Sequence, residues 1–510
     1  MNRADALPEL VRRPGKYEFI KTPLIILVTS MAAVWLVVAY FDVKPVVLST
    51  DKLIFVLVAA VLFFVFYARH REHLHGPWRQ VFRNRVGMVS LVILSAYVGI
   101  GLMDSLHFRL PQSNQHENGR QFYSVEVLSV LDLLLKPLRM HDEKTYSAPF
   151  AAYLYARETV EMPDGSKKRI FPRLSFGGSQ LDDPQRQRGP DIQIKTVRGV
   201  LLGCLMSGIV LLAVLMLLKR KRSVSIRELW RQLVSRDEQI PWLLILLTFS
   251  VLLVGAGIAA SLASGYHVFG TDKVGQDVFY QTLKSIRTAL AIGTLTTLVM
   301  LPFAVLLGIM AGYFRGWVDD VIQYLYMTLS SIPGVLLIAA FILMLQAYMD
   351  SHAAQFVTDS ERADMRLLFL CMILGITSWT GLCRMLRGET MKLSGVDYIQ
   401  AADAFGVRRA RIITRHILPN VMHIVLISIV LDFSSLVLSE AVLSYIGVGV
   451  DPSMYSWGNM INSARLEMAR EPMVWWSLVA AFLFMLGLVL AANLFSDAVR
   501  DAFDPRLRKD

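Results

Sequence analysis

The sequence is short of charged residues and of cysteine. Only 18% of its 510 residues are charged, whereas soluble domains carry about a quarter. The three cysteines, Cys204, Cys371 and Cys383, lie in or near apolar runs, and none lies in a long polar segment. This composition argues against a soluble protein, and the cysteine positions provide no disulfide framework.

Several site patterns are also missing. No G-x-x-x-x-G-K-[ST] loop occurs, so the chain is not expected to bind ATP itself. No catalytic triad or Cys/His pair can be argued from spacing. His70, His73 and His75 have a spacing that could ligate metal, but only Glu72 accompanies them, so no metal site is predicted. We therefore expect no catalytic residues and no cofactor bound by this chain.

Apolar runs of about 20 residues, the length that crosses about 30 Å of hydrocarbon, recur along the chain. They predict ten membrane-spanning segments, at roughly 22–41, 52–68, 85–104, 198–218, 240–263, 286–312, 323–348, 366–386, 422–446 and 474–497. Helices are expected, because backbone groups in lipid must be hydrogen-bonded within the segment. The first run is too long for a signal peptide and no cleavage site follows it, so we expect a retained helix.

The distribution of Lys and Arg predicts the topology. The formal net charge is +11, and basic clusters follow the second, fourth, eighth and tenth predicted spans. The positive-inside rule then places both termini in the cytoplasm of a bacterial cell, with the chain crossing the inner (plasma) membrane many times. Because the positive charge is explained by topology, nucleic acid is not an expected partner, whereas membrane lipid is.

One long loop, about 105–197, is predicted to lie outside the cell as a small α+β domain. Val125–Leu138 has the pattern of an amphipathic helix. Two short strands are expected around a turn at Pro163–Gly165, and Gly177–Asp191 has the composition of a loop. The predicted fold class is therefore an all-α polytopic membrane protein with a small external α+β insert.

The cytoplasmic segment Asp397–Val421 has the pattern of two helices joined by a turn. Gln400 and Asp403 lie on the polar side of the first helix, and Gly406 fits its end, where a left-handed residue favours glycine. Arg415 belongs to the basic side of the second helix, and Pro419 marks a helix boundary. The apolar face of the first helix combines four residues at helical spacing: Tyr398, Ala401, Ala402 and Phe405.

Such a segment, held by membrane helices at both ends, is suited to passing motion from a soluble partner into the membrane. The alternative is an amphipathic loop that rests on the lipid surface. The segment resembles the EAA loop of ABC importer permeases, with Ala401-Ala402, Gly406 and His416–Asn420 in matching positions. Gln400 departs from that family, which usually has glutamate there. The resemblance implies that residues 397–419 form a coupling helix that docks on an ATPase.

Four further blocks resemble the oligopeptide/dipeptide permeases, in particular their C-type subunit. They are His267–Phe279, Ala311–Asp320, Ser439–Met460 and Arg500–Arg508, in the family's order. The first block keeps five motif residues, with Gln276 in place of the usual arginine: Gly270, Thr271, Asp272, Gly275 and Asp277.

The resemblance implies a permease subunit of an ATP-driven importer with a type I core of six helices. Its implied partners are a second homologous permease, two cytoplasmic ATPases that bind ATP and Mg, and an external substrate-binding protein. Peptides are the implied cargo, although relatives carry nickel chelates, opines and sugars. The rival classes are an ion-gradient-driven secondary transporter and a membrane enzyme or sensor acting through residues 105–197, which are otherwise a candidate contact for the binding protein.

The chain has ten predicted spans, four more than the core of six, and two alignments with the family account for the difference. In one, 1–239 is an extension and 240–263 is the first core helix. In the other, "FRNR" marks 78–104 as the first core helix, which we favour because that pattern is specific. In this second alignment, 1–77 contains the tail and two extra helices, and 105–197 is the external domain. Residues 198–263 form an additional hairpin, and 264–510 form the rest of the core.

Ionisable residues in the ninth span are candidates for function, since charge within a membrane is costly. Asp432 and Glu440, with Ser435 and Ser439, predict a polar stripe along a translocation path. The alternative is structural: Glu440 would accept from backbone donors where the helix bends, and Asp432 would pair with another subunit.

Overall fold

The computed structural model describes residues 43–69, 72–117, 120–161, 167–222, 241–352 and 358–503. The predicted span at 22–41 and residues 504–508 of the last motif lie outside the described residues. So do His70 and the turn at Pro163–Gly165.

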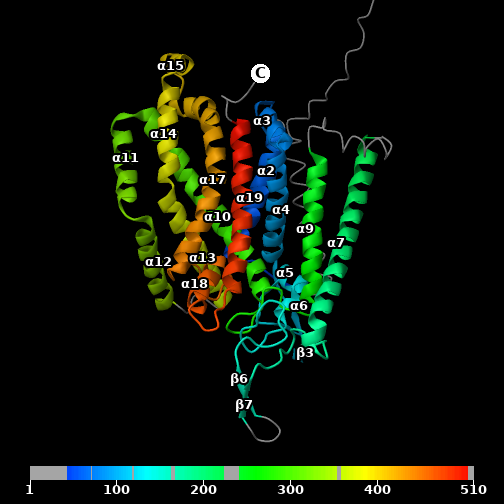
Figure 1. The fold of residues 1–510 in the computed structure, drawn as a ribbon. Coiled ribbons are helices and arrows are strands. Elements are labelled where there is room, and N and C mark those ends of the chain that lie inside the picture. The colour runs from blue at the N-terminus through cyan, green and yellow to red at the C-terminus, as the bar shows by residue number, and fades with distance from the viewer. Residues whose placement is uncertain are drawn as a thin grey trace, which may run out of the picture.

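Long helices standing side by side make up most of the described chain (Figure 1). Within the described residues, nine segments are long and apolar enough to cross a membrane. They are carried by α2 (Ser49–Arg69), α4 (Arg85–Asp104), α7 (Pro184–Arg222), α9 (Trp242–Ala263), α10 (Val278–Phe314), α12 (Gly334–Ser351), α13 with α14 (Asp359–Ser378, Thr380–Ser394), α16 to α17 (Arg409–Ile412, Leu418–Tyr445) and α19 (Trp476–Phe503). The predicted class, a helical polytopic membrane protein, is confirmed.

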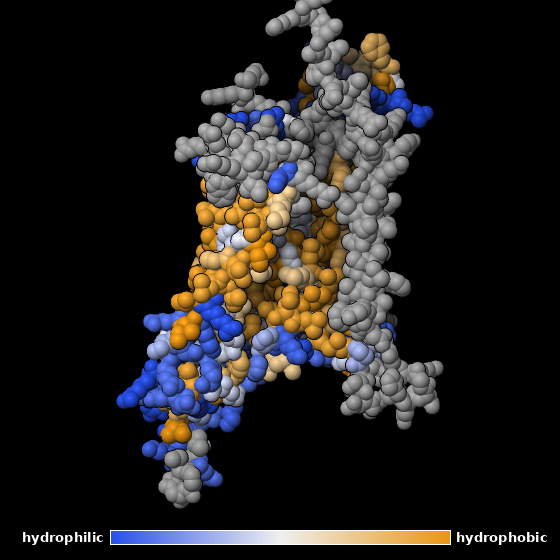
Figure 2. All heavy atoms as spheres, turned by 90° about the vertical axis from the view of Figure 1, so that its right-hand side faces the viewer, coloured by the Kyte–Doolittle hydropathy of each residue, from blue (hydrophilic) through white to orange (hydrophobic). Residues whose placement is uncertain are grey.

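On the face shown in Figure 2, hydrophobic residues cover a broad stretch of the helices, with hydrophilic surface beyond it at the insert. The short helix α15 (Asp397–Ala404) lies at one end of the bundle, and the hairpin of β6 (Glu158–Glu161) and β7 (Lys167–Ile170) lies at the other (Figure 1). The segment expected in the cytoplasm and the insert expected outside are thus at opposite ends, as a bilayer around this hydrophobic stretch requires.

Two predicted boundaries are wrong. The span expected at 323–348 is broken into α11 (Gly316–Ser331) and α12, because Pro333 has no amide hydrogen and disfavours helical geometry at Ile332. The loop expected to Asp191 becomes helical at Pro184, where α7 begins, since proline is well suited to a first helical turn. Helix α7 therefore extends outward beyond the apolar run that predicted it.

The insert contains small antiparallel sheets and short helices. One sheet has the order β1 (Lys44–Val46), β2 (His107–Arg109), β5 (Leu128–Ser129), so the segment before α2 pairs with the insert. A second joins β3 (Pro111–Glu117) to β4 (Arg120–Tyr123). The predicted hairpin is confirmed as β6 (Glu158–Glu161) paired with β7 (Lys167–Ile170).

The amphipathic helix expected at Val125–Leu138 is wrong in extent. It is replaced by β5 and two short helices, α5 (Val130–Leu134) and α6 (Lys136–Arg139). Ser129 and Asp132 form a capping box at the start of α5, and Pro137 lies in the first turn of α6.

Three glycines bring α7 against α9. A Cβ at Gly203 would lie 2.4 Å from the Val254 Cα, and one at Gly257 would lie 2.6 Å from the Gly199 carbonyl oxygen. Small residues permit such close helix contact in membranes, where packing replaces the hydrophobic effect. The α7–α9 hairpin stands at one edge, with α9 also touching α4 (Figure 1).

Candidate functional site

The segment expected to couple to an ATPase forms two helices and a turn. Helix α15 ends at Ala404, and Phe405 is its C-cap. Gly406 follows with φ +71°, a left-handed geometry that glycine adopts at little cost. After α16, the π-helical turn η2 (Ile413–Ile417) leads into α17, with Pro419 in its first turn. The chain therefore passes from α15 into the long membrane helix α17 through a short connection made of α16 and η2.

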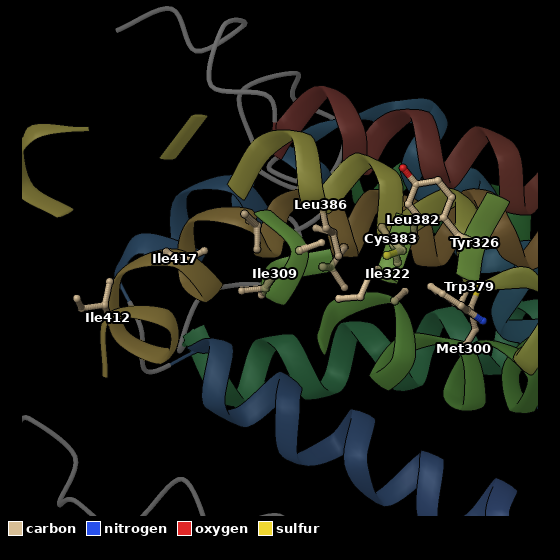
Figure 3. Close-up of a cluster of buried hydrophobic side chains, with 14 of the residues drawn as sticks. Met300, Ile309, Ile322, Tyr326, Trp379, Leu382, Cys383, Leu386, Ile412 and Ile417 are labelled. Carbon is tan, nitrogen blue, oxygen red and sulfur yellow. The ribbon is translucent and has the colours of Figure 1, made fainter. Parts of the chain in front are cut away.

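Buried isoleucines anchor this segment to the bundle. Ile399, Ile412 and Ile417 belong to an apolar cluster with α10, α11 and α14. Figure 3 shows Ile412 and Ile417 at one end of this cluster, which continues toward Met300 and Trp379. Ile399, Ile412 and Ile417 therefore join the segment to these helices through one close-packed core, and such cores have low compressibility.

The opposite side of α15 is exposed. Phe405 is 88% exposed and Tyr398 is 45% exposed, with Ala401 also exposed between them. Ala402 was predicted on this face, but it is half-buried and packs toward the cluster of Ile399, so that assignment is wrong. The outward ridge consists of Tyr398, Ala401 and Phe405, and we refer to it as the α15 ridge.

Polar contacts hold the α15 ridge in place. Asn420 donates through Nδ2 to the Tyr398 hydroxyl at 3.0 Å, which joins the ridge to the start of α17. Gln400 donates through Nε2 to the Gly395 carbonyl oxygen at 3.2 Å, whereas Asp403 and Arg415 are exposed. Gln400 therefore supports the start of α15 and places no negative charge beside the ridge.

The turn between α10 and α11 is tied to the same region. Arg315 and Gly316 both have positive φ, of 51° and 57°. Arg315 donates to the Ser394 hydroxyl at 2.8 Å, near the end of α14. Arg387 of α14 pairs with Asp319 of α11 through two contacts of 2.5 and 2.7 Å. Paired contacts of this kind fix the orientation of both groups.

The block Gly270–Asp277 connects the insert to α10 through hydrogen bonds. Thr271 is fully buried, and its hydroxyl accepts from the Ser147 amide at 2.7 Å and donates to the Thr145 carbonyl at 2.9 Å. Asp277 caps α10 by accepting from the Phe279 and Tyr280 amides.

The remaining residues of the block shape the turn. Asp272 accepts from the amides of Val274 and Gln276, each at 2.9 Å. Gly270 and Gly275 have φ of +68° and +86°. At Gly275 a Cβ would lie 1.7 Å from the Glu143 carbonyl oxygen, so no other residue fits. These contacts fix the turn and join it to the insert and to the start of α10.

His267 is held between two carboxylates, which the sequence did not predict. Its Nδ1 is 2.7 Å from Asp277 Oδ2, and its Nε2 is 3.7 Å from Glu143 Oε1. Burial opposes the charged form, but the hydrogen bond with Asp277 and the negative charge of Glu143 raise the pKa of His267 to about 9. The histidine is therefore a buried imidazolium joining the insert to the start of α10.

The predicted polar stripe on α17 divides in two. Ser435 is exposed, and Asp432 and Ser439 are half-buried on the same side of the helix. Glu440 is only 2% exposed and accepts from the Ser444 hydroxyl at 2.7 Å. Since Ser444 in turn accepts from the Val450 amide, Glu440 supports the bend after α17 and does not share the surface of the other three.

The sequence also did not predict a buried ionic network, which lies at the ends of the helices nearer the insert. Arg287 of α10 contacts Asp51 of α2 at 2.7 Å and Asp364 of α13 at 3.6 Å. One turn earlier, Lys284 contacts Asp104 of α4 at 2.5 Å and Asp132 of the insert at 3.0 Å. The sequence signal that could have indicated this network is the presence of charged residues at the start of apolar runs.

Comparison with known proteins gives the family. Residues 304–509 match the family described as "Binding-protein-dependent transport system inner membrane component". The chain is 33% identical over 245 residues to the glutathione transport system permease protein GsiD of Pectobacterium atrosepticum, covering 48% of this chain and 74% of that protein. It is 30% identical over 251 residues to the oligopeptide permease OppC of Haemophilus influenzae, covering 49% and 74%. The Bacillus subtilis dipeptide permease DppC is 27% identical over 246 residues, covering 48% and 71%.

The chain belongs to this family of binding-protein-dependent permeases. It is an inner-membrane, multi-pass permease subunit of an ABC transporter, as the resemblance of its motifs implied. It is not the catalytic component, because ATP is bound in this family by partner ATPases.

Proposed function

We propose that this chain is the C-type permease of an ATP-driven importer for peptides or peptide-like solutes. It would enclose the translocation path with a second, homologous permease, while two cytoplasmic ATPases bind ATP and Mg. Relatives named for oligopeptide, dipeptide and glutathione transport support this cargo class. The observation that carries the coupling role is the exposed α15 ridge above an anchor of buried isoleucines.

The proposed mechanism is mechanical. Closure of the ATPases on ATP would displace the α15 ridge, and Ile399, Ile412 and Ile417 would pass that displacement to α10, α11 and α14. Asp432, Ser435 and Ser439 of α17 are our candidates for the path surface, whereas Glu440 is assigned a structural role. The exposed arginines of the coupling segment favour a cytoplasmic position, with the insert outside and both termini inside.

We also propose α4 as the first core helix and α7–α9 as an additional hairpin. Helix α4 packs against both α10 and α19, and Tyr97 donates to the Phe484 carbonyl oxygen at 2.9 Å. Helix α9 packs mainly on α7, and almost none of its span is buried. A core helix is expected to pack against other core helices, as α4 does against α10 and α19.

Replacing Phe405 by aspartate tests the coupling role. We expect transport by the assembled importer to fall about tenfold or more, because a charge replaces an exposed aromatic anchor at a protein interface. Stability should change by less than about 0.5 kcal/mol, since the side chain is almost free of intramolecular contact. Uptake in proteoliposomes and co-purification of the ATPases are the measurements.

Leu466→Asp is the matched control, because Leu466 is 69% exposed at the opposite end of the molecule. It should leave ATPase co-purification unchanged. Normal transport and normal ATPase retention by Phe405→Asp would refute the coupling role of the α15 ridge.

For the external binding protein, we propose contact at a cleft of about 740 Å³ between the insert and the loop before α19. Its lining includes Arg157, Arg169 and Arg188, against one carboxylate, Glu471. No described carboxylate lies within ion-pair distance of these arginines, and Phe171 faces Arg157 at 5.1 Å. Arginines beside aromatic rings in a cleft are suited to binding acidic protein surface.

Arg169→Glu should therefore raise the concentration of binding protein needed for half-maximal ATPase stimulation by about tenfold, equivalent to about 1.4 kcal/mol. Lys168→Glu makes the same charge change on the neighbouring residue of β7, outside the cleft, and should have an effect of less than about twofold. Equal effects of the two variants would remove the cleft from the interface.

A further inference from the structure

An apolar groove opens between α4, α9 and α19 in the half of the bundle nearer the α15 ridge. Its volume is about 330 Å³, and its walls include Val89 and Ile93 of α4, Leu244 of α9, and Leu490 and Leu494 of α19. The hydroxyl of Ser90, which also lies there, donates to the Val86 carbonyl at 2.9 Å. The groove therefore offers a ligand little besides hydrocarbon surface along its length.

The groove belongs to the part of the chain that a bilayer surrounds. All three helices carry apolar spans, and Leu490 and Leu494 of α19 are exposed beside the groove. Water cannot enter the hydrocarbon of a bilayer at low cost, so the occupant must be apolar. Gly487 and Ala491 supply only small side chains to this wall, which leaves the hollow.

One end of the groove is positively charged. Arg85, the first residue of α4, lines it and is exposed. The preceding helix α3 (Glu72–Arg83) adds exposed Arg79 and Arg83, which together with Arg85 make this end of the groove basic. Exposed arginines at the end of an apolar groove, on the cytoplasmic side, favour an anionic headgroup.

Helix α3 is fixed at that end. Trp78 packs edge-on against Phe503 of α19 with ring centroids 5.5 Å apart, and Val81 is buried with Val499. The basic residues therefore stand at a set position relative to α19. A preformed site loses less conformational entropy on binding than a mobile one.

We propose that this groove binds one acyl chain of an anionic glycerophospholipid of the cytoplasmic leaflet, with the lipid phosphate against Arg85. The wall contributed by Leu244 comes from the α7–α9 hairpin, so the additional helices help to build the site. The proposal depends on the orientation given above, but not on the cargo or on the ATPase contact. It assigns the hairpin a role in holding lipid beside α4 and α19.

The test is native mass spectrometry of the purified full chain in mild detergent, titrated separately with phosphatidylglycerol and phosphatidylcholine. Wild type should retain one phosphatidylglycerol with about tenfold higher affinity than phosphatidylcholine, a difference typical of a charge-assisted phosphate contact. Arg85→Gln should abolish the preference, and Arg85→Lys, which keeps the charge, should largely preserve it.

Val89→Phe is designed to fill the groove and should weaken binding of both lipids, whereas Val98→Phe adds the same bulk to an exposed position of α4 outside it. Equal affinity of wild type for the two lipids would overturn the proposal. Retention by Val89→Phe equal to that of wild type would also overturn it. Failure of wild type to retain any lipid would point to a protein segment as the occupant and would likewise refute it.

Discussion

Replacing Arg287 by methionine is expected to lower the free energy of unfolding by about 3–5 kcal/mol, the cost of removing one partner from a buried ion pair. Arg287 is 6% exposed, and its guanidinium contacts Asp51 at 2.7 Å and Asp364 at 3.6 Å. The substitution leaves Asp364 buried without its cation, and leaves Asp51 with the ring of His107 2.8 Å away as its remaining ion-pair partner. Thermal unfolding in detergent can be followed by the reaction of the buried thiols of Cys371 and Cys383 with a thiol dye, in a Cys204→Ser background.

Arg362→Met is the matched control, because its pair with Asp350 is solvent-exposed on both sides. Such surface pairs contribute about 0–1 kcal/mol. In a double-mutant cycle, Asp51→Asn should cost less in the Arg287→Met background than in wild type, since its partner has already gone. A loss below about 1 kcal/mol for Arg287→Met would show that the network does not hold the helices together.

This network gives the N-terminal elements a definite relation to the permease. Asp51 belongs to α2, and Thr50 beside it donates from its amide to Asp364 at 3.0 Å. Asp132 belongs to the insert and accepts from the Tyr280 hydroxyl at 2.7 Å. The first turns of α10 are therefore held by contacts from α2 and from the insert, which makes both of them part of the folded core.

Apolar runs predicted the helices well, because the length of a run is fixed by the thickness of hydrocarbon. They predicted helix ends poorly, because an end depends on residues outside the run. Helix α7 continues outward to Pro184 through polar residues that no hydropathy argument selects. Pro333 could have predicted the break between α11 and α12 from the sequence. The residues on both sides of it are apolar, however, so the segment was predicted as one continuous span.

The sequence predicted which segment forms the candidate site more accurately than which of its side chains are exposed. Periodicity placed Ala402 with Phe405, whereas burial turns Ala402 inward with Ile399. The separation of Glu440 from Ser435 likewise depends on which neighbours enclose α17. Contacts between residues distant in sequence, such as Arg287 with Asp51, leave no periodic signal at all.

His267→Gln is expected to lower the free energy of unfolding by about 3 kcal/mol near neutral pH. The pKa of His267 is raised to about 9 from about 6.5, because Asp277 and Glu143 outweigh the effect of burial, and each pKa unit corresponds to about 1.36 kcal/mol. Glutamine keeps one hydrogen-bond donor but removes the charge. The carboxylate of Glu143, whose pKa is lowered to about 2, would then rely on its bonds from Ser175 and Phe176.

The pH dependence distinguishes the charge from the shape of the side chain. Since the folded-state pKa lies above the unfolded value, the contribution of His267 is complete below about pH 6.5 and is lost as pH rises through about 9. The difference in unfolding free energy between wild type and His267→Gln should therefore shrink between about pH 6 and about pH 9.5. The Phe176 ring contacts both His267 and His141, with ring centroids 5.4 and 3.9 Å apart. His141→Gln is therefore the matched control and should show no such trend. A difference that stays constant across that range would mean that His267 acts through packing, with no buried positive charge joining the insert to α10.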